Sequence, residues 1–541
     1  MGATGERVKS VRFACGLLVV VSFLAYAPVW SAYFLADDFA YTKLYAQRPI
    51  SEWAQVAAGD WTRGVWGFRM DELRSVMGLA FWGDGKLWPV EPAGYHFTNL
   101  LFHAACSILV FLLARALVGS GFVPLLAGLL FSLHPAHSEA VSWISGRADP
   151  MCACFSLASL LAFVQYRAGG RRLLYGWSLA AFVLALFSKE IAITFPLLPL
   201  GYDLFRDKKP AERWRHLWRA HAGFGGLLAA YALLRSTVFA HPIRANALTP
   251  AVLREFAVRQ ITYLKFLAAG PGVENDAIWA AALVVFVIVV WRRAPWRRTL
   301  LFLGPWWFVA GVIPLIVTYA SARHLYLTSA GACLLLAAGL ATLAPRRLFA
   351  ASAIAVLSMF GFLLVRQNLR WSDAARISRS AQAAIAELAR SLPPNAGLIL
   401  DVPAGRDGAY LWLSSLPMAL DPPFIAGGVY EKLRVVEKPV TYRYWAGADG
   451  AGKTWLQDRR PVIEDLAANP ADCYYIGLNE AGEVMTAQFA AAEVKATLTP
   501  LVELVDARNP YDSVFTLDAQ WDSFWKRALM ERGGRITRAA Q

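Results

Sequence analysis

Charged residues are scarce in this chain: Asp, Glu, Lys and Arg make up only 17% of its 541 residues. Soluble proteins contain about 25% charged residues. Hydrophobic residues, in contrast, account for 57% of the chain, which excludes disorder, collagen-like repeats and an ordinary cytosolic enzyme. The composition predicts a polytopic membrane protein.

Cysteine is rare as well. The chain has 6 cysteines, and their spacing gives no disulfide framework. Cys152 and Cys154 lie two residues apart on a predicted helix and point in different directions, while Cys473 is alone in its region. We therefore expect no disulfide.

Long apolar runs recur along the first two thirds of the chain. A helix needs about 20 apolar residues to cross roughly 30 Å of hydrocarbon. The first run follows Arg7, Lys9 and Arg12, is too long for a signal peptide, and lacks a clear cleavage site, so we expect an uncleaved anchor. The candidate spans are 13–35, 97–117, 122–139, 150–166, 173–190, 191–205, 218–239, 276–291, 299–319, 324–343 and 347–366.

Lysine and arginine gather on alternate connections between these runs. With about eleven crossings, every basic connection falls on the side of the N-terminus, which the positive-inside rule makes cytoplasmic. This alternation requires residues 252–269 to stay on the outer side as a re-entrant or in-plane helix. The net charge of +14 thus follows mostly from topology and does not indicate nucleic-acid binding.

Two long segments face outward in this topology. Residues 36–96 are rich in acids and tryptophan, which suits helices at the lipid interface. Residues 372–541 begin with a polar helical stretch, stopped by Pro393 and Pro394, and show no internal repeat. We predict a membrane domain of 1–371, which includes the loop 36–96, and an extracytoplasmic α/β domain of 372–541. Its β-rich runs are 397–402, 440–445, 473–478 and 513–517.

Ionisable residues cluster at the outer ends of the predicted spans. Such residues are expensive at membrane depth and are functional candidates by default. Five separate loops bring acids, bases and cations to one face, which a structural protein has little reason to do. The residues are Asp37, Asp38, His96, Asn99, His103, His134, His137, Glu139, Arg147, Asp149, Lys189, Glu190, Arg323 and His324.

Each of these groups also has a structural explanation. Adjacent acids could simply end a helix, and the histidines of the second span could make interhelical hydrogen bonds. Arg323 and Lys189 could pair with Asp149 or Glu190. A divalent metal is a further alternative, because His134, His137 and Glu139 form a feasible ligand set. Capping or packing around Pro135 explains that cluster equally well.

Six motifs occur in order along the chain. They are ADDF (36–39), YHFTNLLFHAA (95–105), LFSLHPAHSEAVSWISGRAD (130–149), LFSKEIAITFPLLPLGYDL (186–204), ARHLYLTSAG (322–331) and NLRWSD (368–373). Together they resemble the transmembrane and tetratricopeptide-repeat O-mannosyltransferases and their bacterial relatives, members of the GT-C glycosyltransferase superfamily. The resemblance covers roughly residues 10–373 and implies an integral membrane enzyme. Such an enzyme moves one sugar from a polyprenyl-phosphate carrier to an acceptor on the non-cytoplasmic side.

The sequence departs from the family pattern in two places. The tail has no tetratricopeptide repeats, so the choice of acceptor is not carried over from repeat-bearing relatives. His324 stands where the family's RYLY-type motif has Tyr.

Glycosyl transfer from a phosphate needs a base for the acceptor hydroxyl and positive charge for the departing phosphate. Similar enzymes place the base at the leading acid of a pair in the first outward loop, which implies Asp37, with Asp38 in support. Arg323 is the leading candidate for the phosphate, followed by Arg147 and Lys189. The sugar and phosphate pocket is expected to include His134, His137, Glu139 and Tyr326, with His96, His103, Asp149 and Glu190 in support.

A single displacement of this kind inverts the anomeric configuration. Relatives with a monophosphate donor generally work without a metal, so we expect no metal and no other cofactor. We expect a bacterial inner-membrane protein with a periplasmic active site and a protein, glycan or lipid acceptor.

Two other functions compete with this hypothesis. A transporter or flippase of lipid-linked sugars would show paired halves and polar groups near the midplane, and neither is found in the sequence. A binding or scaffolding role of the tail is the other alternative. The presence of Asp37, Asp38 and Arg323 argues against it.

Overall fold

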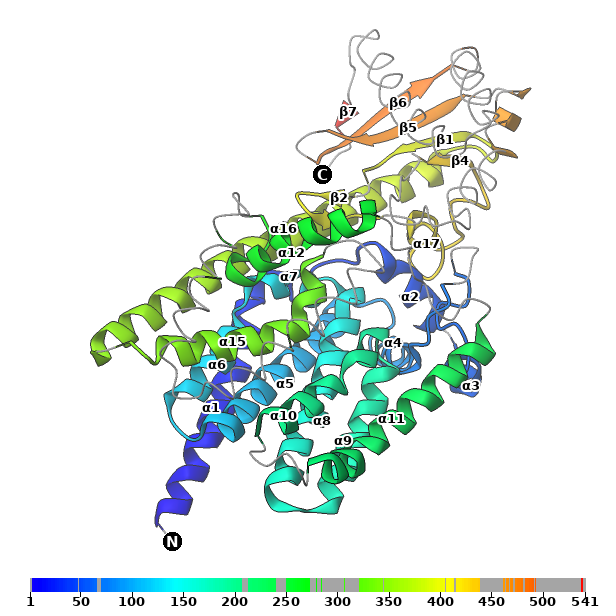
Figure 1. Cartoon of the computed structure of the whole chain (residues 1–541). Coiled ribbons are helices and arrows are strands. Elements are labelled where there is room, and N and C mark those ends of the chain that lie inside the picture. Colours follow the sequence, from blue (N-terminus) through cyan, green and yellow to red (C-terminus); the bar gives the residue numbers. More distant parts are fainter. Residues whose placement is uncertain are drawn as a thin grey trace. The chain divides into compact units, whose positions relative to one another are not determined.

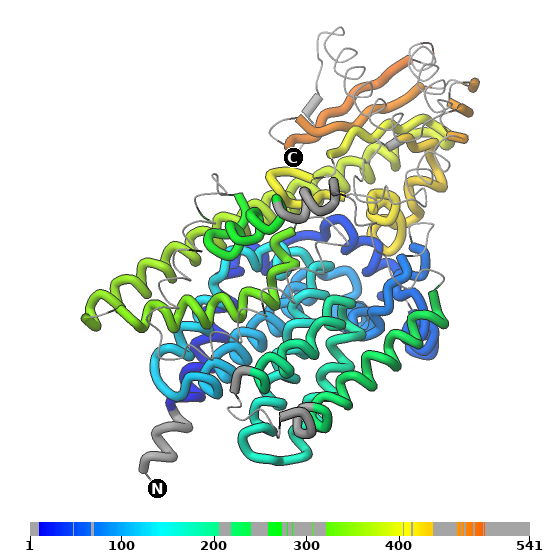
Figure 2. The backbone as a smooth tube through the Cα atoms, in the orientation of Figure 1, coloured from blue at the N-terminus to red at the C-terminus, as the bar shows by residue number. Residues whose placement is uncertain are grey.

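The computed structural model describes most of the chain (Figures 1 and 2). By internal contacts the chain divides into two units. The first comprises Met1–Ser31, Arg48–Arg63 and Met70–Leu369, and the second comprises Ala32–Gln47, Gly64–Arg69 and Arg370–Gln541. The described residues are 2–46, 48–65, 70–206, 213–239, 250–272, 321–343, 345–403, 405–412, 415–437, 472–479 and 482–490, with a few isolated residues within 279–306 and 461–538.

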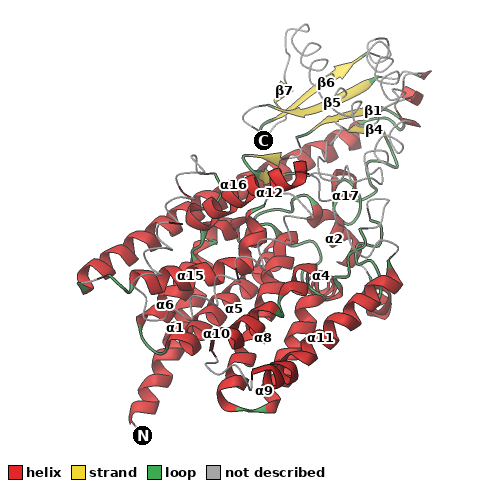
Figure 3. Ribbon diagram, in the orientation of Figure 1, coloured by secondary structure: helices red, strands yellow, loops and turns green. Residues whose placement is uncertain are grey.

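The described part of the first unit is helical (Figure 3). Short helices and 3-10 turns connect its longer helices: α3 (Trp53–Ala57), α7 (Ser138–Ser142), η1 (Ala27–Val29), η2 (Ile50–Glu52), η3 (Pro135–His137), η4 (Ile144–Arg147), η5 (Glu190–Thr194) and η6 (Ala322–Leu325). The longer helices are α1 (Gly2–Ala25), α4 (Ser75–Leu87), α5 (Pro92–Val118), α6 (Phe122–Ser132), α8 (Ala148–Gly169), α9 (Arg172–Leu186), α10 (Leu197–Arg206), α11 (Arg213–Val238), α12 (Pro250–Ala269), α15 (Tyr326–Leu340) and α16 (Arg346–Ser391).

Nine of the predicted spans coincide with helices, and the spans 276–291 and 299–319 lie outside the described residues. Within the described part of the chain, three helical stretches are long and apolar enough to cross a membrane: Pro92–Val118, Ile144–Gly169 and Arg346–Ser391. The stretches Ser10–Ala25, Phe122–Ser132 and Arg172–Leu186 are apolar but shorter.

Proline moves several helix ends from their predicted places. The first helix ends at Ala25, because Pro28 belongs to the turn that follows, and α6 ends at Ser132, ahead of Pro135. No such break follows the predicted span 347–366. Instead, the helix runs on past the span, so that α16 has 46 residues in all, roughly 69 Å at 1.5 Å per residue. It ends just before Pro393.

Small and hydroxylated residues join the helices of the first unit. Helix α5 packs against α1, α6 and α8, and α8 packs along α9 (Figure 1). Ser22 of α1 and Ser132 of α6 share a 2.9 Å hydrogen bond, and Ser159 of α8 donates to the Ser178 carbonyl of α9 at 2.7 Å. A Cβ atom on Gly128 would lie 3.0 Å from Leu18, so this glycine permits close approach of α6 to α1. These are contacts typical of helices packed in lipid.

A five-stranded mixed sheet forms the centre of the second unit, in the order β4-β1-β5-β6-β7. Strand β1 pairs in parallel with β4 and β5, with Gly397 opposite both Arg434 and Cys473. The predicted strands at 397–402 and 473–478 are confirmed as β1 and β5, whereas 440–445 and 513–517 lie outside the described residues. The strands are β1 (Gly397–Asp401), β4 (Arg434–Glu437), β5 (Cys473–Leu478), β6 (Val484–Phe489) and β7 (Thr537–Arg538).

The second unit also contains the part of α16 from Arg370 onward, two short helices and a hairpin. The hairpin joins β2 (Gly405–Arg406) to β3 (Ala409–Tyr410), and α17 (Leu416–Ala419) follows it. The other short helix, α2 (Asp37–Ala46), comes from the N-terminal part of the chain and packs against α17. Part of the predicted loop 36–96 thus groups with the C-terminal segment.

Candidate active site

Most candidate residues of the first unit lie on the connections between helices or at helix ends, whereas His96 and His103 lie within α5. Turn η3 packs against η6, and both contact α12 and α7. The loops after α6 and before α15, nearly 200 residues apart in sequence, are therefore neighbours in space.

The histidines make buried hydrogen bonds between helices. His103 of α5 bonds through Nδ1 to the Tyr326 hydroxyl of α15 at 2.6 Å and through Nε2 to the Ser132 carbonyl at 3.1 Å. His137 Nε2 lies 2.7 Å from the Ser329 hydroxyl, and its ring packs against Tyr326. His103 therefore makes the interhelical hydrogen bonds that were the structural explanation for the histidines of the second span. His137 and Tyr326 belong to the same buried hydrogen-bonded cluster.

His134 has a partner for each ring nitrogen. Its Nε2 lies 3.1 Å from the Leu267 carbonyl of α12, and its Nδ1 accepts a 3.2 Å hydrogen bond from the Ala136 amide. No group of three His, Cys, Asp or Glu side chains within the described residues could hold a metal ion.

Arg323 of η6 pairs with Glu139 of α7. Its guanidinium lies 3.7 Å from the Glu139 carboxylate and 4.9 Å from the centre of the Trp143 ring. Ser321 also donates a hydrogen bond to Glu139, at 2.5 Å. Glu139 is thus a partner of Arg323 that the sequence did not indicate. His324, at the family's Tyr position, bonds to the Tyr263 hydroxyl of α12 at 3.1 Å.

Arg147 is the least exposed of the three cations predicted to bind phosphate, with an exposed fraction of 0%. Its Nη1 donates to the Asp84 carboxylate of α4 at 2.5 Å, and its Nη2 donates to the Tyr95 carbonyl of α5 at 3.1 Å. The guanidinium also stacks on Phe81 at 4.4 Å. This arrangement makes Arg147 a part of the scaffold that joins α4, α5 and η4.

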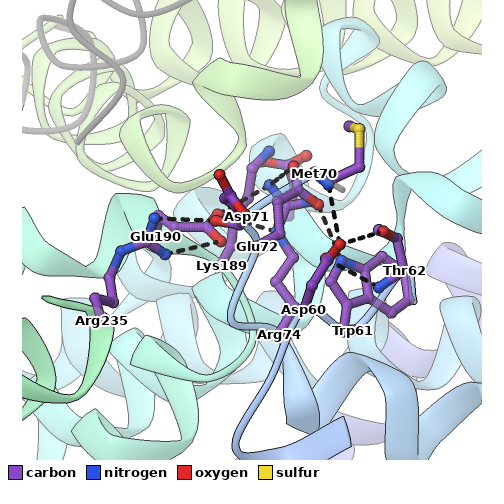
Figure 4. Close-up of polar contacts among 11 residues, drawn as sticks. Asp60, Trp61, Thr62, Met70, Asp71, Glu72, Arg74, Lys189, Glu190 and Arg235 are labelled. Carbon is purple, nitrogen blue, oxygen red and sulfur yellow. Dashed lines mark hydrogen bonds and ion pairs between the residues drawn. The ribbon is translucent and has the colours of Figure 1, made fainter. Parts of the chain in front are cut away.

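A cluster of charged residues surrounds Lys189 and Glu190 (Figure 4). The Lys189 ammonium lies 2.6 Å from Asp149, which corresponds to the predicted structural alternative for this pair. The Glu190 carboxylate forms ion pairs with Arg74 at 2.9 Å and with Arg235 at 3.8 Å. The cluster continues through Arg74 to Glu72, at 3.0 Å.

Sequence reasoning missed Arg74 and Arg235 of this cluster. Arg235 lies near the end of the predicted span 218–239, where a charged residue was itself a signal. Arg74 lies within the acid-rich loop 36–96 and had no signal of its own. Arg235 also donates to the Asp71 carbonyl at 3.1 Å, so the two arginines fasten residues 71–74 to the start of η5.

The cations of the cluster act on one another. Burial lowers the pKa of Lys189, which lies beyond the end of α9; Asp149 opposes this effect, and the charges of Arg323 and Arg74 lower the pKa further. Arg323, Arg74 and Lys189 therefore share one electrostatic neighbourhood. Each of the three is also paired with a carboxylate, Arg323 with Glu139, Arg74 with Glu190 and Lys189 with Asp149.

Asp37 and Asp38 belong to the second unit, at the start of α2. Asp38 is 1% exposed, and its carboxylate accepts a 3.0 Å hydrogen bond from the Leu35 amide. Asp37 is half-buried. The two acids thus differ in exposure, and their roles as base and supporting acid stay predictions. His96 is buried on α5 of the first unit.

Several curated proteins are similar to parts of this chain, although no family model matches it. The mouse protein O-mannosyl-transferase TMTC2 is 31% identical over 188 residues, which are 32% of this chain and 22% of that protein. The Drosophila melanogaster protein O-mannosyl-transferase Tmtc1 is 33% identical over 33% of this chain and 21% of its own length. Human TMTC4 is 26% identical over 52% of this chain and 42% of its own. The chain thus matches only about a fifth of the length of the first two relatives.

Solved structures share the fold over most of the chain. The ArnT of Cupriavidus metallidurans, solved with bound undecaprenyl phosphate, has a TM-score of 0.50 at 13% identity and covers 88% of this chain and 94% of its own. The oligosaccharyltransferase of Archaeoglobus fulgidus has a TM-score of 0.50 at 12% identity and covers 86% and 68%. The chain is therefore a multi-pass membrane protein with the fold of the GT-C glycosyltransferases, similar in sequence to the protein O-mannosyl-transferases.

Proposed function

We propose that this protein is a glycosyltransferase that moves a sugar from a polyprenyl-phosphate carrier to a hydroxyl group of an acceptor. The observation that carries the proposal is the set of cations held by carboxylates on the connections of the first unit, Lys189 by Asp149, Arg74 by Glu190 and Arg323 by Glu139. They occur in a fold shared with a solved ArnT that holds undecaprenyl phosphate. Sequence similarity to named O-mannosyl-transferases supports the same reaction class.

Asp37 is the proposed base. It takes the proton of the acceptor hydroxyl while the hydroxyl oxygen attacks the anomeric carbon of the donor. The bond between that carbon and the phosphate oxygen breaks, and the polyprenyl phosphate leaves with both bonding electrons. Because the attack is a single displacement from the opposite face, the anomeric configuration is inverted.

Arg323 and Lys189 stabilise the charge that the phosphate gains as the bond breaks. Glu139 and Asp149 hold these two cations in place through the contacts described above. No step of this reaction requires a metal, and we propose that none takes part. We place the protein in the bacterial inner membrane, with its N-terminus in the cytoplasm and its second unit in the periplasm. The acceptor is a protein, a glycan or a lipid.

The test uses the purified full-length protein in lipid nanodiscs. A panel of polyprenyl-phosphate-linked sugars is offered with a membrane extract as the source of acceptors, and the transfer of labelled sugar is measured. We expect transfer from at least one donor and its loss in Asp37→Asn with donor binding retained. Equal transfer by Asp37→Asn and the wild type would overturn the base assignment.

A liposome assay separates the enzyme from the transporter. Movement of a lipid-linked sugar across the bilayer, without transfer to any acceptor in the extract, would favour the flippase and contradict the proposal.

A further inference from the structure

The helix that carries Asp37 is bound by segments from the far end of the sequence. Residues Ala32–Gln47 group with Arg370–Gln541, although the rest of the described N-terminal part groups with the membrane helices. Three kinds of contact within the second unit fix this segment, and each lies close to Asp37.

The first contact fixes the backbone where it enters α2. Ala36, directly before Asp37, has a φ of +47°, in the left-handed region that residues other than glycine rarely adopt. Its amide donates a hydrogen bond of 2.5 Å to the carbonyl of Leu411, which is fully buried. A non-glycine residue persists in this conformation only when its surroundings determine it. Here the partner of the Ala36 amide comes from the C-terminal segment.

The second contact is an aromatic cluster. Phe424 lies in the loop Asp421–Gly428 that follows α17, and its ring packs at 5.4 Å from Phe34 and 4.9 Å from Phe39, between ring centres. Phe34 and Phe39 are both 0% exposed, one on each side of Asp37 in the sequence. Edge-to-face packing of this kind restricts the orientation of the rings as well as burying them.

The third kind of contact is polar and involves residues that come before and after Asp37 in the sequence. Lys43 of α2 pairs with Asp421 at 2.8 Å. Before α2, Ser378 of α16 donates to the Phe34 carbonyl at 3.1 Å, and Tyr33 donates to Gln382 at 2.5 Å. Gln382 in turn donates to the Ala419 carbonyl of α17. The start of α2 is thus held between α16 and the loop after α17.

We propose that the loop Asp421–Gly428 positions the base, so that Asp421 and Phe424 are positioning residues for the transfer reaction. The inference rests on the proposed function, in which Asp37 is that base. It assigns a role to the C-terminal segment of the second unit, which holds residues Ala32–Gln47 in the geometry that the reaction needs. Misplacing a base lowers the turnover rate while leaving the binding of the donor intact.

A physical test does not depend on activity. Hydrogen–deuterium exchange is followed on peptides covering residues 32–46 in the wild-type protein and in the variants Asp421→Asn and Phe424→Leu. The matched control is Asp465→Asn, which removes the 2.9 Å ion pair between Asp465 and Arg434 elsewhere in the same unit. We expect faster exchange in residues 32–46 for the two loop variants alone. Unchanged exchange in both loop variants would overturn the inference.

The kinetic test separates positioning from stability. For Phe424→Leu we expect kcat to fall about tenfold with the KM for the donor unchanged. The reason is that loss of the Phe424 ring changes the position of Asp37 and leaves the binding of the donor intact. The charge exchange Lys43→Asp with Asp421→Lys should restore most of the kcat lost in Asp421→Lys alone. In an Asp37→Asn background, Phe424→Leu should cause no further loss, since the base is already absent.

These outcomes distinguish the two proposals. If the wild-type protein transfers no sugar, the proposed function fails while the exchange test of the loop still stands. If transfer requires Asp37 but kcat is unchanged in Phe424→Leu, only the positioning role fails. A fall in kcat that is equally large in Asp465→Asn would also contradict it.

Discussion

Asp38 and Leu35 hold each other through two hydrogen bonds at the start of α2. The Asp38 carboxylate accepts from the Leu35 amide at 3.0 Å, and the Asp38 amide donates to the Leu35 carbonyl at 3.0 Å. A reciprocal pair of this kind fixes the first turn of a helix. The Asp38 carboxylate therefore has a structural task, whereas Asp37 is the proposed base.

Substitutions of Asp37 and of Asp38 should have different effects on the rate of sugar transfer and on stability. Asp37→Asn should lower the rate of sugar transfer about 10²- to 10⁴-fold, the usual contribution of a general base. Asp38→Asn keeps an oxygen that accepts the Leu35 bond and should change the rate far less. Asp38→Ala loses that bond and should lower the free energy of unfolding by about 1 kcal/mol. Transfer rates and thermal unfolding of the three variants check this prediction, and a larger rate loss in Asp38→Asn than in Asp37→Asn would contradict it.

Arg323 should matter for the donor rather than for folding. Arg323→Gln removes a charged donor that contributes about 1.5–3 kcal/mol to a charged partner, which corresponds to a rise of about 10- to 100-fold in the Kd for a polyprenyl phosphate. Arg323→Lys keeps the charge but loses the planar fork, so an intermediate Kd is expected. Binding of a labelled polyprenyl phosphate measures the effect. An unchanged Kd in Arg323→Gln would remove Arg323 from the phosphate site.

Arg147, in contrast to Arg323, should matter for folding rather than for binding of the donor. Arg147→Met leaves the Asp84 carboxylate buried without its cation, which typically costs about 3–5 kcal/mol. Adding Asp84→Asn should recover part of the loss, because Thr98 still donates to that side chain at 2.7 Å. Thermal unfolding in detergent provides the measurement. A stable Arg147→Met protein with a weakened affinity for the donor would instead favour direct binding of the phosphate.

Gly397 tests the packing of the second unit. A Cβ atom at Gly397 would lie 2.2 Å from the Cys473 sulfur, so in Gly397→Ala the thiol must turn away or β1 and β5 must move apart. Overpacking of this kind costs about 1–3 kcal/mol. The double variant with Cys473→Ala removes the sulfur and should recover most of that loss. Proteolysis of the second unit reports the effect, and equal protection of Gly397→Ala and the wild type would show that the strands adjust freely.

The thiol of Cys473 offers a probe of the same packing. Burial raises its pKa to about 12, so the thiol stays protonated near pH 8 and should react slowly with iodoacetamide in the folded protein. Modification of the Cys473 peptide, followed by mass spectrometry, should increase sharply in Gly397→Ala. Rapid labelling of the wild-type protein would show that β1 and β5 separate readily at this end of the sheet.

Much of the fold follows from local patterns in the sequence. The apolar runs at 97–117 and 150–166 lie within α5 and α8, and the β-rich runs at 397–402 and 473–478 are strands. The ends of these elements were harder to predict, because a turn such as Ala27–Val29 or the uninterrupted course of α16 depends on surrounding packing as well as on local residues.

The sequence by itself determined which residues are charged and that they lie beside apolar helices, because hydropathy and chemical type belong to each residue. Only the tertiary structure decided their partners. It joined Arg147 to Asp84 and Arg323 to Glu139, brought Arg74 and Arg235 to Glu190, and grouped Asp37 with the C-terminal segment. Such pairs depend on which connections meet when distant helices pack, and no local pattern contains that information.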